Sequence, residues 1–185
     1  KTIWNRIVRW NSMYISSNCL KKYIKDSDSI DFNKVWNDFT IHSAEIDSIE
    51  EKGKDINNVV VAKIVSLSKH PTNEKYNVAK LDVGFSEITV VSSATNLYEG
   101  MYVPCALEGG SLKGLEKVTK VELGGVLSEG VLASEKELGI SDSHLGVMDL
   151  SKEYKVGENI KEYIPIDDII IEIDNKSLTN RPDMW

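Results

Sequence analysis

The sequence predicts an α+β protein in which a small β-barrel or sandwich, residues 57–150, is inserted into a discontinuous α/β domain. Two observations carry this prediction: a central series of short β-branched segments, and helix-periodic or mixed segments on either side of it. The outer pieces, residues 13–56 and 151–185, are each too short to bury a core, because a segment near or below ~40 residues seldom folds alone. We expect them to pack together as one domain, preceded by a basic extension over residues 1–12.

The first outer piece is predicted to contain two helices between two strands. Residues 13–16 are expected to form a short strand that leads into a helix containing Cys19, Leu20, Tyr23 and Ile24. Residues 44–49 alternate like a half-buried strand, and a polar linker follows at 50–58. Asp31 is placed to cap the second helix. The apolar stripe of that helix has the spacing i, i+3, i+4, i+7 and consists of Phe32, Val35, Trp36 and Phe39.

The central region changes to period-two segments separated by Gly, Asn and Ser turns. Several short strands at this spacing predict a barrel or sandwich rather than a βαβ fold. A capping-box pattern from Ser134 to Glu137 predicts one short helix, because each end of the motif satisfies an orphan amide of the other. The expected strands are 59–67, 76–83, 88–92, 102–107, 118–123 and 130–133.

The last outer piece returns to mixed structure. A short helical stretch is expected over residues 158–163 and stops at Pro165, which cannot continue a helix. Residues 168–174 alternate like a strand with one apolar face. The isoleucines of that face are Ile169, Ile171 and Ile173.

Composition favours a cytoplasmic protein without a membrane span. The net charge is −7, no apolar run approaches the roughly 20 residues that cross a bilayer, and the N-terminus has no signal-peptide core. Cys19 and Cys105 lie in apolar surroundings without a Cys or His at metal-ligand spacing. We expect two reduced, buried thiols rather than a disulfide, and neither a metal site nor a cofactor in this chain.

Polar loops between the central strands are the candidate binding elements, because no catalytic or phosphate-cradling motif occurs anywhere in the sequence. OB-type barrels bind nucleic acid across one face with such loops and stack bases on aromatic side chains. An alternative that the pattern supports equally is ordinary turn chemistry with tyrosines packed at the barrel rim. The loops span residues 69–75, 92–96, 127–130 and 134–139, and the stacking candidates are Tyr76, Tyr98 and Tyr102.

Charge limits how such a face can bind. Residues 57–151 hold eight lysines against twelve acidic residues, a net charge of −4, and no arginine. The guanidinium fork is the usual group for bidentate recognition of bases and phosphates, so binding here depends on Lys, hydroxyls, backbone amides and aromatic faces. We expect weak, shape-led RNA binding that falls steeply with salt.

A series of short motifs runs through the central region. In order, these are Val61-Ala62-Lys63-Ile64, Lys69-His70-Pro71, Lys75-Tyr76-Asn77-Val78, Leu81-Asp82-Val83-Gly84, Ser93-Ala94-Thr95-Asn96, Val103-Pro104, Ser128-Glu129-Gly130 and Ser134-Glu135-Lys136-Glu137-Leu138-Gly139-Ile140. They resemble the tRNA-binding domain of the endothelial monocyte-activating polypeptide type. The resemblance implies an OB-type fold that contacts tRNA. The residues assigned to that contact are Lys63, Lys69, His70, Asn73, Lys75, Tyr76, Ser93, Asn96, Lys113, Lys117, Ser128, Glu129, Ser134 and Lys136.

The flanks carry a second resemblance. The segments are Met13-Tyr14-Ile15-Ser16, Leu20-Lys21-Lys22-Tyr23-Ile24 and Ala44-Glu45-Ile46-Asp47 before the barrel, and Glu172-Ile173-Asp174 and Thr179-Asn180-Arg181-Pro182-Asp183 after it. They resemble the N-terminal part of the bacterial phenylalanyl-tRNA synthetase β subunit, whose discontinuous first domain holds an OB-type insertion. The resemblance implies a non-catalytic, tRNA-binding part of a phenylalanine–tRNA ligase. ATP-dependent aminoacylation, with ATP and Mg²⁺, would then require the α subunit as a partner.

Two other functions remain open at this point. One is a free-standing OB-fold tRNA-binding cofactor or chaperone, against which the split outer domain argues. The other is a protein-interaction module that does not bind RNA, a possibility that the acidic central region favours.

Overall fold

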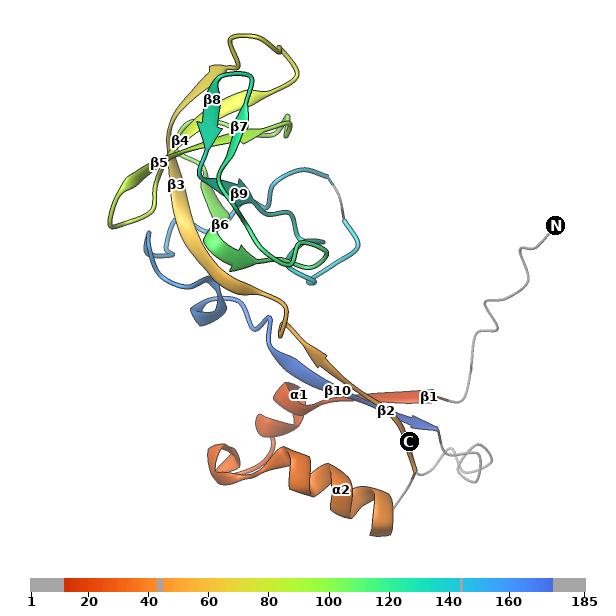
Figure 1. Cartoon of the computed structure of the whole chain (residues 1–185). Helices are drawn as coiled ribbons and strands as arrows, with labels where there is room; N and C mark the ends of the chain where they lie inside the picture. The colour runs from red at the N-terminus through yellow and green to blue at the C-terminus, as the bar shows by residue number, and fades with distance from the viewer. Residues whose placement is uncertain (1–11, 43–44, 144, 175–185) are drawn as a thin grey trace, which may run out of the picture. The chain divides into compact units, whose positions relative to one another are not determined.

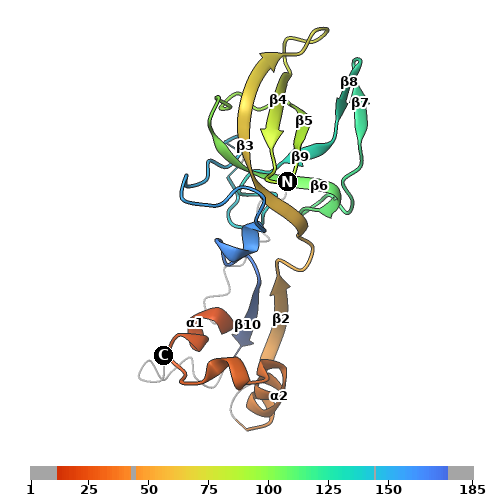
Figure 2. The same cartoon turned by 90° about the vertical axis from the view of Figure 1, so that its left-hand side faces the viewer.

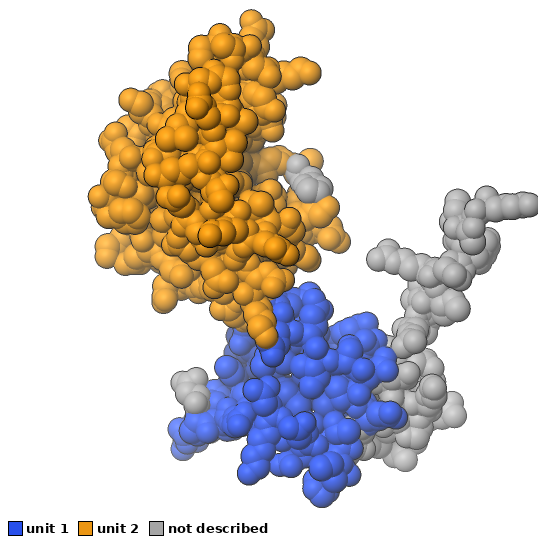
Figure 3. All heavy atoms as spheres, viewed as in Figure 1, with its two compact units in different colours: residues 1–52, 168–185 blue, residues 53–167 orange. Residues whose placement is uncertain are grey.

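A computed structural model (Figure 1, and Figure 2 after a turn of 90°) describes residues 12–42, 45–143 and 145–174. The chain divides into two compact units, which are coloured in Figure 3: a split unit of residues 1–52 and 168–185, and a barrel unit of residues 53–167. Most of the basic extension and the Thr179–Asp183 motif lie outside the described residues. Within the described ranges, no helix has the length and apolar character needed to cross a membrane.

A three-stranded antiparallel sheet forms the split unit. Strand β10 (Asp168–Asp174) lies in the middle, between β1 (Ser12–Ser16) and β2 (Ile46–Lys52). Ile171 pairs with Ile15 on one side and with Ile49 on the other. The strand from the second outer piece is therefore held on both edges by strands from the first.

Two helices of the split unit begin at side-chain caps. Helix α1 (Ser17–Lys21) starts at Ser16, whose hydroxyl accepts a hydrogen bond from the Cys19 amide at 3.0 Å. It is shorter than predicted, because the chain turns at Lys22 and leaves Tyr23 83% exposed. A 3-10 turn, η1 (Ser27–Ser29), then leads toward the second helix.

Helix α2 (Phe32–His42) confirms the predicted cap and most of the predicted apolar stripe. The Asp31 carboxylate accepts hydrogen bonds from the amides of Asn33 (3.0 Å) and Lys34 (3.4 Å). Trp36 is buried and its ring lies 6.1 Å from that of Phe32, whereas Val35 is 39% exposed, so the stripe is narrower than predicted. The core of the unit is Phe32, Trp36, Ile171 and Ile173, with Met13, Ile15, Leu20, Ile30, Phe39, Ile46 and Ile169 packed against it.

A curled β-structure, in which the described strands pair antiparallel, forms the barrel unit. Its longest strand, β3, has 13 residues; it pairs with β6 along its first half and with β4 along its second half. Irregular pairing near Asn58 and Ser66 bends this strand, as β-bulges do. The main sheet has the order β5-β4-β3-β6-β9, with β3 (Asn57–Lys69), β4 (Asn77–Asp82), β5 (Glu87–Ser92), β6 (Tyr102–Ser111) and β9 (Gly130–Leu132).

The two edges of this sheet approach each other through one short segment. The amide of Glu129 donates to the carbonyl of Thr89 on β5 at 2.8 Å, next to the start of β9. A separate hairpin, β7 (Val121–Leu123) and β8 (Val126–Ser128), precedes this contact. The predicted strand at 118–123 is therefore only the first arm of a hairpin that turns at Gly124 and Gly125.

Strand β3 is buried on both faces, since Val59, Val60, Val61 and Ala62 are each at most 8% exposed. One face, with Val60, Ala62 and Ile64, points into the curled sheet, toward Leu81, Val90, Met101 and Val103. The other face is covered by the chain that follows the sheet, with Leu138, Leu150, Ile160 and Ile166 packed against Val59 and Val61.

The second boundary between the two units lies later in the chain than predicted. Residues 151–167 belong with the barrel unit rather than with the outer pieces. The carbonyl of Glu158 accepts from the Val61 amide at 2.9 Å, and the Gly157 amide donates to the Val61 carbonyl at 2.8 Å. These two hydrogen bonds attach the segment to β3. The helical stretch expected over residues 158–163 is only a 3-10 turn, η2 (Ile160–Glu162).

The two cysteines differ in environment. Both are free thiols, but Cys19 is exposed, contrary to the prediction, because α1 turns it away from the core of the split unit. Cys105 is fully buried inside the curled sheet, and desolvation raises the pKa of its thiol to about 12.

This contrast predicts a two-step reaction with a thiol reagent. Because its thiol is exposed to the reagent, Cys19 should react rapidly with a disulfide reagent at pH 8. Cys105, protonated and shielded, should react only when the barrel unit unfolds. The number of thiols that react before and after addition of denaturant measures this, and the Cys19→Ser variant should abolish the early reaction alone. Immediate reaction of both thiols would contradict it.

Candidate nucleic-acid interface

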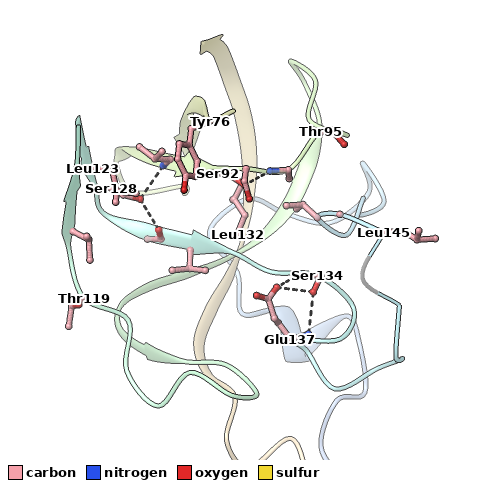
Figure 4. A pocket seen from close by; sticks show the side chains of 18 residues that line it. Tyr76, Ser92, Thr95, Thr119, Leu123, Ser128, Leu132, Ser134, Glu137 and Leu145 are labelled. Carbon is pink, nitrogen blue, oxygen red and sulfur yellow. Dashed lines mark hydrogen bonds between the residues drawn. The ribbon is translucent and has the colours of Figure 1, made fainter. Parts of the chain in front are cut away.

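A hollow of about 780 Å³ opens on the barrel unit between the end of β5, the β7–β8 hairpin and the segment that follows β9 (Figure 4). We call it the barrel hollow. In Figure 4, Tyr76 and Ser92 lie on one side, Thr119, Leu123 and Ser128 on another, and Ser134 and Glu137 on a third. Its remaining walls are Val91, Ser93, Ala94, Thr95, Val121, Gly130, Val131, Leu132, Leu145, Gly146 and Val147.

A second depression of about 600 Å³ adjoins it, and we call it the lysine groove. It lies between the β3–β4 loop and the loop that follows β5. Ser93 and Thr95 line both depressions, so the two share an edge. The other residues of the groove are Leu67, Lys69, Glu74, Lys75, Asn77 and Leu97.

The β3–β4 loop is shaped by its own backbone and by Asn73. The Asn73 side chain accepts from the Lys75 amide at 3.1 Å, and its carbonyl accepts from the Tyr76 amide at 3.0 Å. The His70 amide closes the loop by donating to the Tyr76 carbonyl at 3.1 Å. This turn leaves Lys69 and Lys75 exposed at the groove and turns the Tyr76 ring toward the hollow.

His70 is buried beneath this loop and fastens it to the hairpin. Its Nε2 lies 2.8 Å from the carbonyl oxygen of Leu123, and its Nδ1 accepts from the Thr72 amide at 3.3 Å. Because the carbonyl can only accept, Nε2 acts as the donor, while Nδ1 acts as the acceptor for the amide. The ring also meets Tyr76 edge to face, with centroids 6.3 Å apart.

Ser128 and Glu129 hold the closing segment of the sheet. The Ser128 hydroxyl accepts from the Val91 amide and donates to the Gly130 carbonyl, both at 3.1 Å. The Glu129 carboxylate accepts from the Thr89 amide at 3.3 Å and forms an ion pair of 3.3 Å with Lys120. This bond to Glu129 raises the pKa of Lys120.

The far wall of the hollow depends on two further fixed contacts. Ser134 and Glu137 form the predicted capping box: the Ser134 amide donates to the Glu137 carboxylate at 2.7 Å, and the Glu137 amide donates to the Ser134 hydroxyl at 3.3 Å. It closes one turn only, not the predicted helix, because Gly139 ends it in a left-handed conformation. Asn96 pairs with both backbone groups of Val147, at 2.7 and 3.1 Å.

The comparisons with known proteins match the part of the chain that carries these loops. The family model described as "Putative tRNA binding domain" matches residues 59–159, more than half of the chain. The chain belongs to this family. The match begins in β3 and ends in the segment that covers it, so the tRNA binding domain corresponds closely to the barrel unit.

Similar proteins carry the name phenylalanine–tRNA ligase beta subunit. Identity is 41% over 84% of this chain for the Leptospira biflexa protein, 38% over 88% for that of Francisella tularensis and 34% over 88% for that of Coxiella burnetii. The chain spans about a fifth of the length of these relatives, 19% to 20%. Among solved structures, it is similar to a MetRS related protein from Pyrococcus horikoshii, at 15% identity and a TM-score of 0.41.

The tRNA binding domain brings only part of the predicted contact set together. The hollow collects Tyr76, Ser93, Ser128 and Ser134, and the groove collects Lys69, Lys75 and Ser93. The hydrogen bonds of His70, Asn73, Asn96, Ser128, Glu129 and Ser134 described above all go to groups of the domain itself. Direct contact of these six residues with RNA therefore stays a prediction.

The other predicted lysines lie outside both depressions. The Lys63 ammonium sits over the Tyr102 ring, 5.7 Å from its centroid. Lys113 and Lys117 are exposed in the loop after β6, and Lys136 is exposed on the capping-box turn. Of the three tyrosines predicted to stack, only Tyr76 lines the hollow. The Tyr98 hydroxyl instead donates to the Asp149 carboxylate at 2.8 Å, and this hydrogen bond raises the pKa of Tyr98.

Sequence reasoning missed the apolar part of the hollow. Val121 and Leu123 come from the hairpin, and Leu145 and Val147 come from the segment after the capping box. The Gly124-Gly125 turn marks a hairpin, but nothing in the sequence indicates which other elements that hairpin faces.

Proposed function

We propose that this chain is the N-terminal, tRNA-binding part of a phenylalanine–tRNA ligase β subunit. The similarity to beta subunits extends beyond the tRNA binding domain to more than four-fifths of the chain. We further propose that the barrel unit is an OB-type barrel inserted into a discontinuous α/β domain. Its five-stranded curled sheet, closed by the Glu129–Thr89 hydrogen bond, supports that assignment.

The proposed role is to hold tRNA, not to perform chemistry. In the complete enzyme, an α subunit would be the partner in a soluble, cytoplasmic hetero-oligomer. ATP-dependent aminoacylation of tRNA(Phe), with ATP and Mg²⁺, would take place there, and this part of the β subunit would be non-catalytic.

The lysine groove is the observation that carries the RNA-binding proposal. Lys69 and Lys75 are exposed, and neither has an ion-pair partner within the described ranges, whereas Lys120 is held by Glu108 and Glu129. Unpaired ammonium groups in a concave site attract phosphate and release counterions when they bind it. Glu74 lines the same groove, which keeps the local charge low and the expected affinity weak.

The test is the salt dependence of tRNA binding. The double variant Lys69→Ala/Lys75→Ala should weaken binding and reduce the slope of log K against log[salt] by about one for each lysine removed. The matched control is Lys152→Ala, an exposed lysine that lines neither depression, and it should leave the slope unchanged. Binding that is undetectable or independent of salt in the unaltered chain would refute RNA binding by this chain.

A protein-interaction role is the second candidate, favoured by the net charge of −4 over residues 57–151 and by the absence of arginine there. One experiment distinguishes RNA binding from a protein-interaction role. Retention of an α subunit after nuclease treatment, with no detectable tRNA affinity, would favour the interaction module.

A further inference from the structure

The barrel hollow and the lysine groove differ in charge although they share an edge. Lys69 and Lys75 line the groove, but among the described residues no lysine or arginine lines the hollow. Of the described residues that line the hollow, one is charged: Glu137, whose carboxylate is already bonded to Ser134. A phosphate is therefore stabilised in the groove and disfavoured in the hollow.

The hollow instead exposes apolar and aromatic surface. Val121 is 47% exposed, Leu123 36% and Leu145 93%, and all three line it. The Tyr76 ring faces the same space (Figure 4). Its volume of about 780 Å³ falls within the roughly 300–1,000 Å³ typical of sites for small molecules. The walls suit a flat, uncharged ring.

Hydroxyl groups are available at its rim. Within the described ranges, the side chains of Ser93, Thr95 and Thr119 and the hydroxyl of Tyr76 have no hydrogen-bond partner, unlike Ser128 and Ser134, which are engaged by the fold. A nucleobase edge and a ribose 2′-hydroxyl both offer donors and acceptors to such groups. The shared edge at Ser93 and Thr95 lies where base and backbone would meet.

On the basis of these lining residues, we propose that the barrel hollow holds an unstacked nucleobase of a single-stranded RNA segment while the lysine groove holds the adjoining phosphates. This proposal rests on the proposed function. Lys75 and Tyr76 are neighbours in the chain, yet Lys75 lines the groove and Tyr76 lines the hollow. A single strand can therefore engage both depressions with consecutive groups. Stacking of this kind is tolerant of sequence, since every base has a π-face.

The experiment compares an unstructured oligouridylate with the same oligonucleotide carrying abasic riboses, both titrated into the full chain. The unaltered chain should bind the intact strand about tenfold more tightly, because the abasic strand keeps the phosphates and loses the base. Val121→Trp, which fills the hollow from an exposed position, should remove that difference. Val65→Trp is the matched control, since Val65 is 48% exposed on β3 and lines neither depression.

Tyr76→Ala provides a second route to the same result. It should weaken binding of the intact strand and leave the abasic strand unchanged, whereas Lys75→Ala should weaken both strands by the same factor. Equal binding of the two strands by the unaltered chain would overturn the base site while leaving RNA binding intact. Equal losses on both strands for Val121→Trp would also overturn it. Failure to bind either strand or tRNA would refute the proposed function, and the base site with it.

Discussion

Gly84→Ala is expected to lower the free energy of unfolding of the barrel unit by about 2–4 kcal/mol. Gly84 has a φ of +86°, and a Cβ atom there would lie 2.7 Å from the carbonyl oxygen of Val156 and 2.8 Å from the Cα of Gly157. Both contacts are with backbone, so no side chain can rotate away. The substitution must displace one of the two loops.

The loop that would move is the one that covers β3. Its Gly157 amide and Glu158 carbonyl are both bonded to Val61. Displacing it would loosen the apolar cover that Ile160 and Ile166 place on the outer face of that strand. The expected loss therefore exceeds the conformational cost of a positive φ alone.

Gly100→Ala separates the two contributions. Gly100 has nearly the same φ, +85°, but a Cβ atom there would meet nothing within 4 Å. It should cost only about 1–2 kcal/mol, the strain of a left-handed alanine. Urea unfolding of both variants measures the difference. Equal losses would show that the Gly84–Gly157 approach contributes nothing to stability.

The close contact between Gly84 and Gly157 also illustrates what the sequence does not predict. The run Val59-Val60-Val61-Ala62 was expected to lie in a strand, and it does, but the structure buries that strand on both faces, which a period-two pattern does not predict. What covers the outer face is a segment with almost no regular structure, joined to β3 at the isolated bridge between Val60 and Asn159. Without periodicity, that segment gives no signal of its place, so residues 151–167 were predicted to lie in the wrong unit.

By contrast, β10 could be predicted almost residue by residue. Its alternating isoleucines are a local pattern, and the strand spans Asp168–Asp174 as expected. The Asp31 cap and the Ser134–Glu137 capping box were also predictable, because both partners lie within three residues of each other.

The candidate site was predictable as a set of loops but not as a set of contacts. Asn96, His70 and Ser128 stand out in the sequence as polar loop residues available to a ligand. Their partners are backbone groups 51, 53 and 37 residues away, at Val147, Leu123 and Val91. Such pairings follow from the closure of the sheet, which no local pattern encodes.

His70→Ala is expected to lower the free energy of unfolding by about 2 kcal/mol and to release the β7–β8 hairpin from the β3–β4 loop. The change removes the donor to the Leu123 carbonyl and the acceptor for the Thr72 amide, and it empties the space against Tyr76. Amide hydrogen exchange should therefore accelerate at Val126, which pairs with Leu123, more than at Val61 in the center of β3.

Two conservative variants separate the halves of this contact. His70→Gln places an amide donor where Nε2 lies, so it should restore protection of the hairpin. His70→Asn places an acceptor where Nδ1 lies, so it should recover the Thr72 bond but not the link to Leu123. Since Val121 and Leu123 form one wall of the barrel hollow, hairpin protection and base-dependent RNA binding should fall together in His70→Ala and return together in His70→Gln. Loss of protection spread evenly over the barrel unit would instead mean that His70 supports the whole sheet and not this wall.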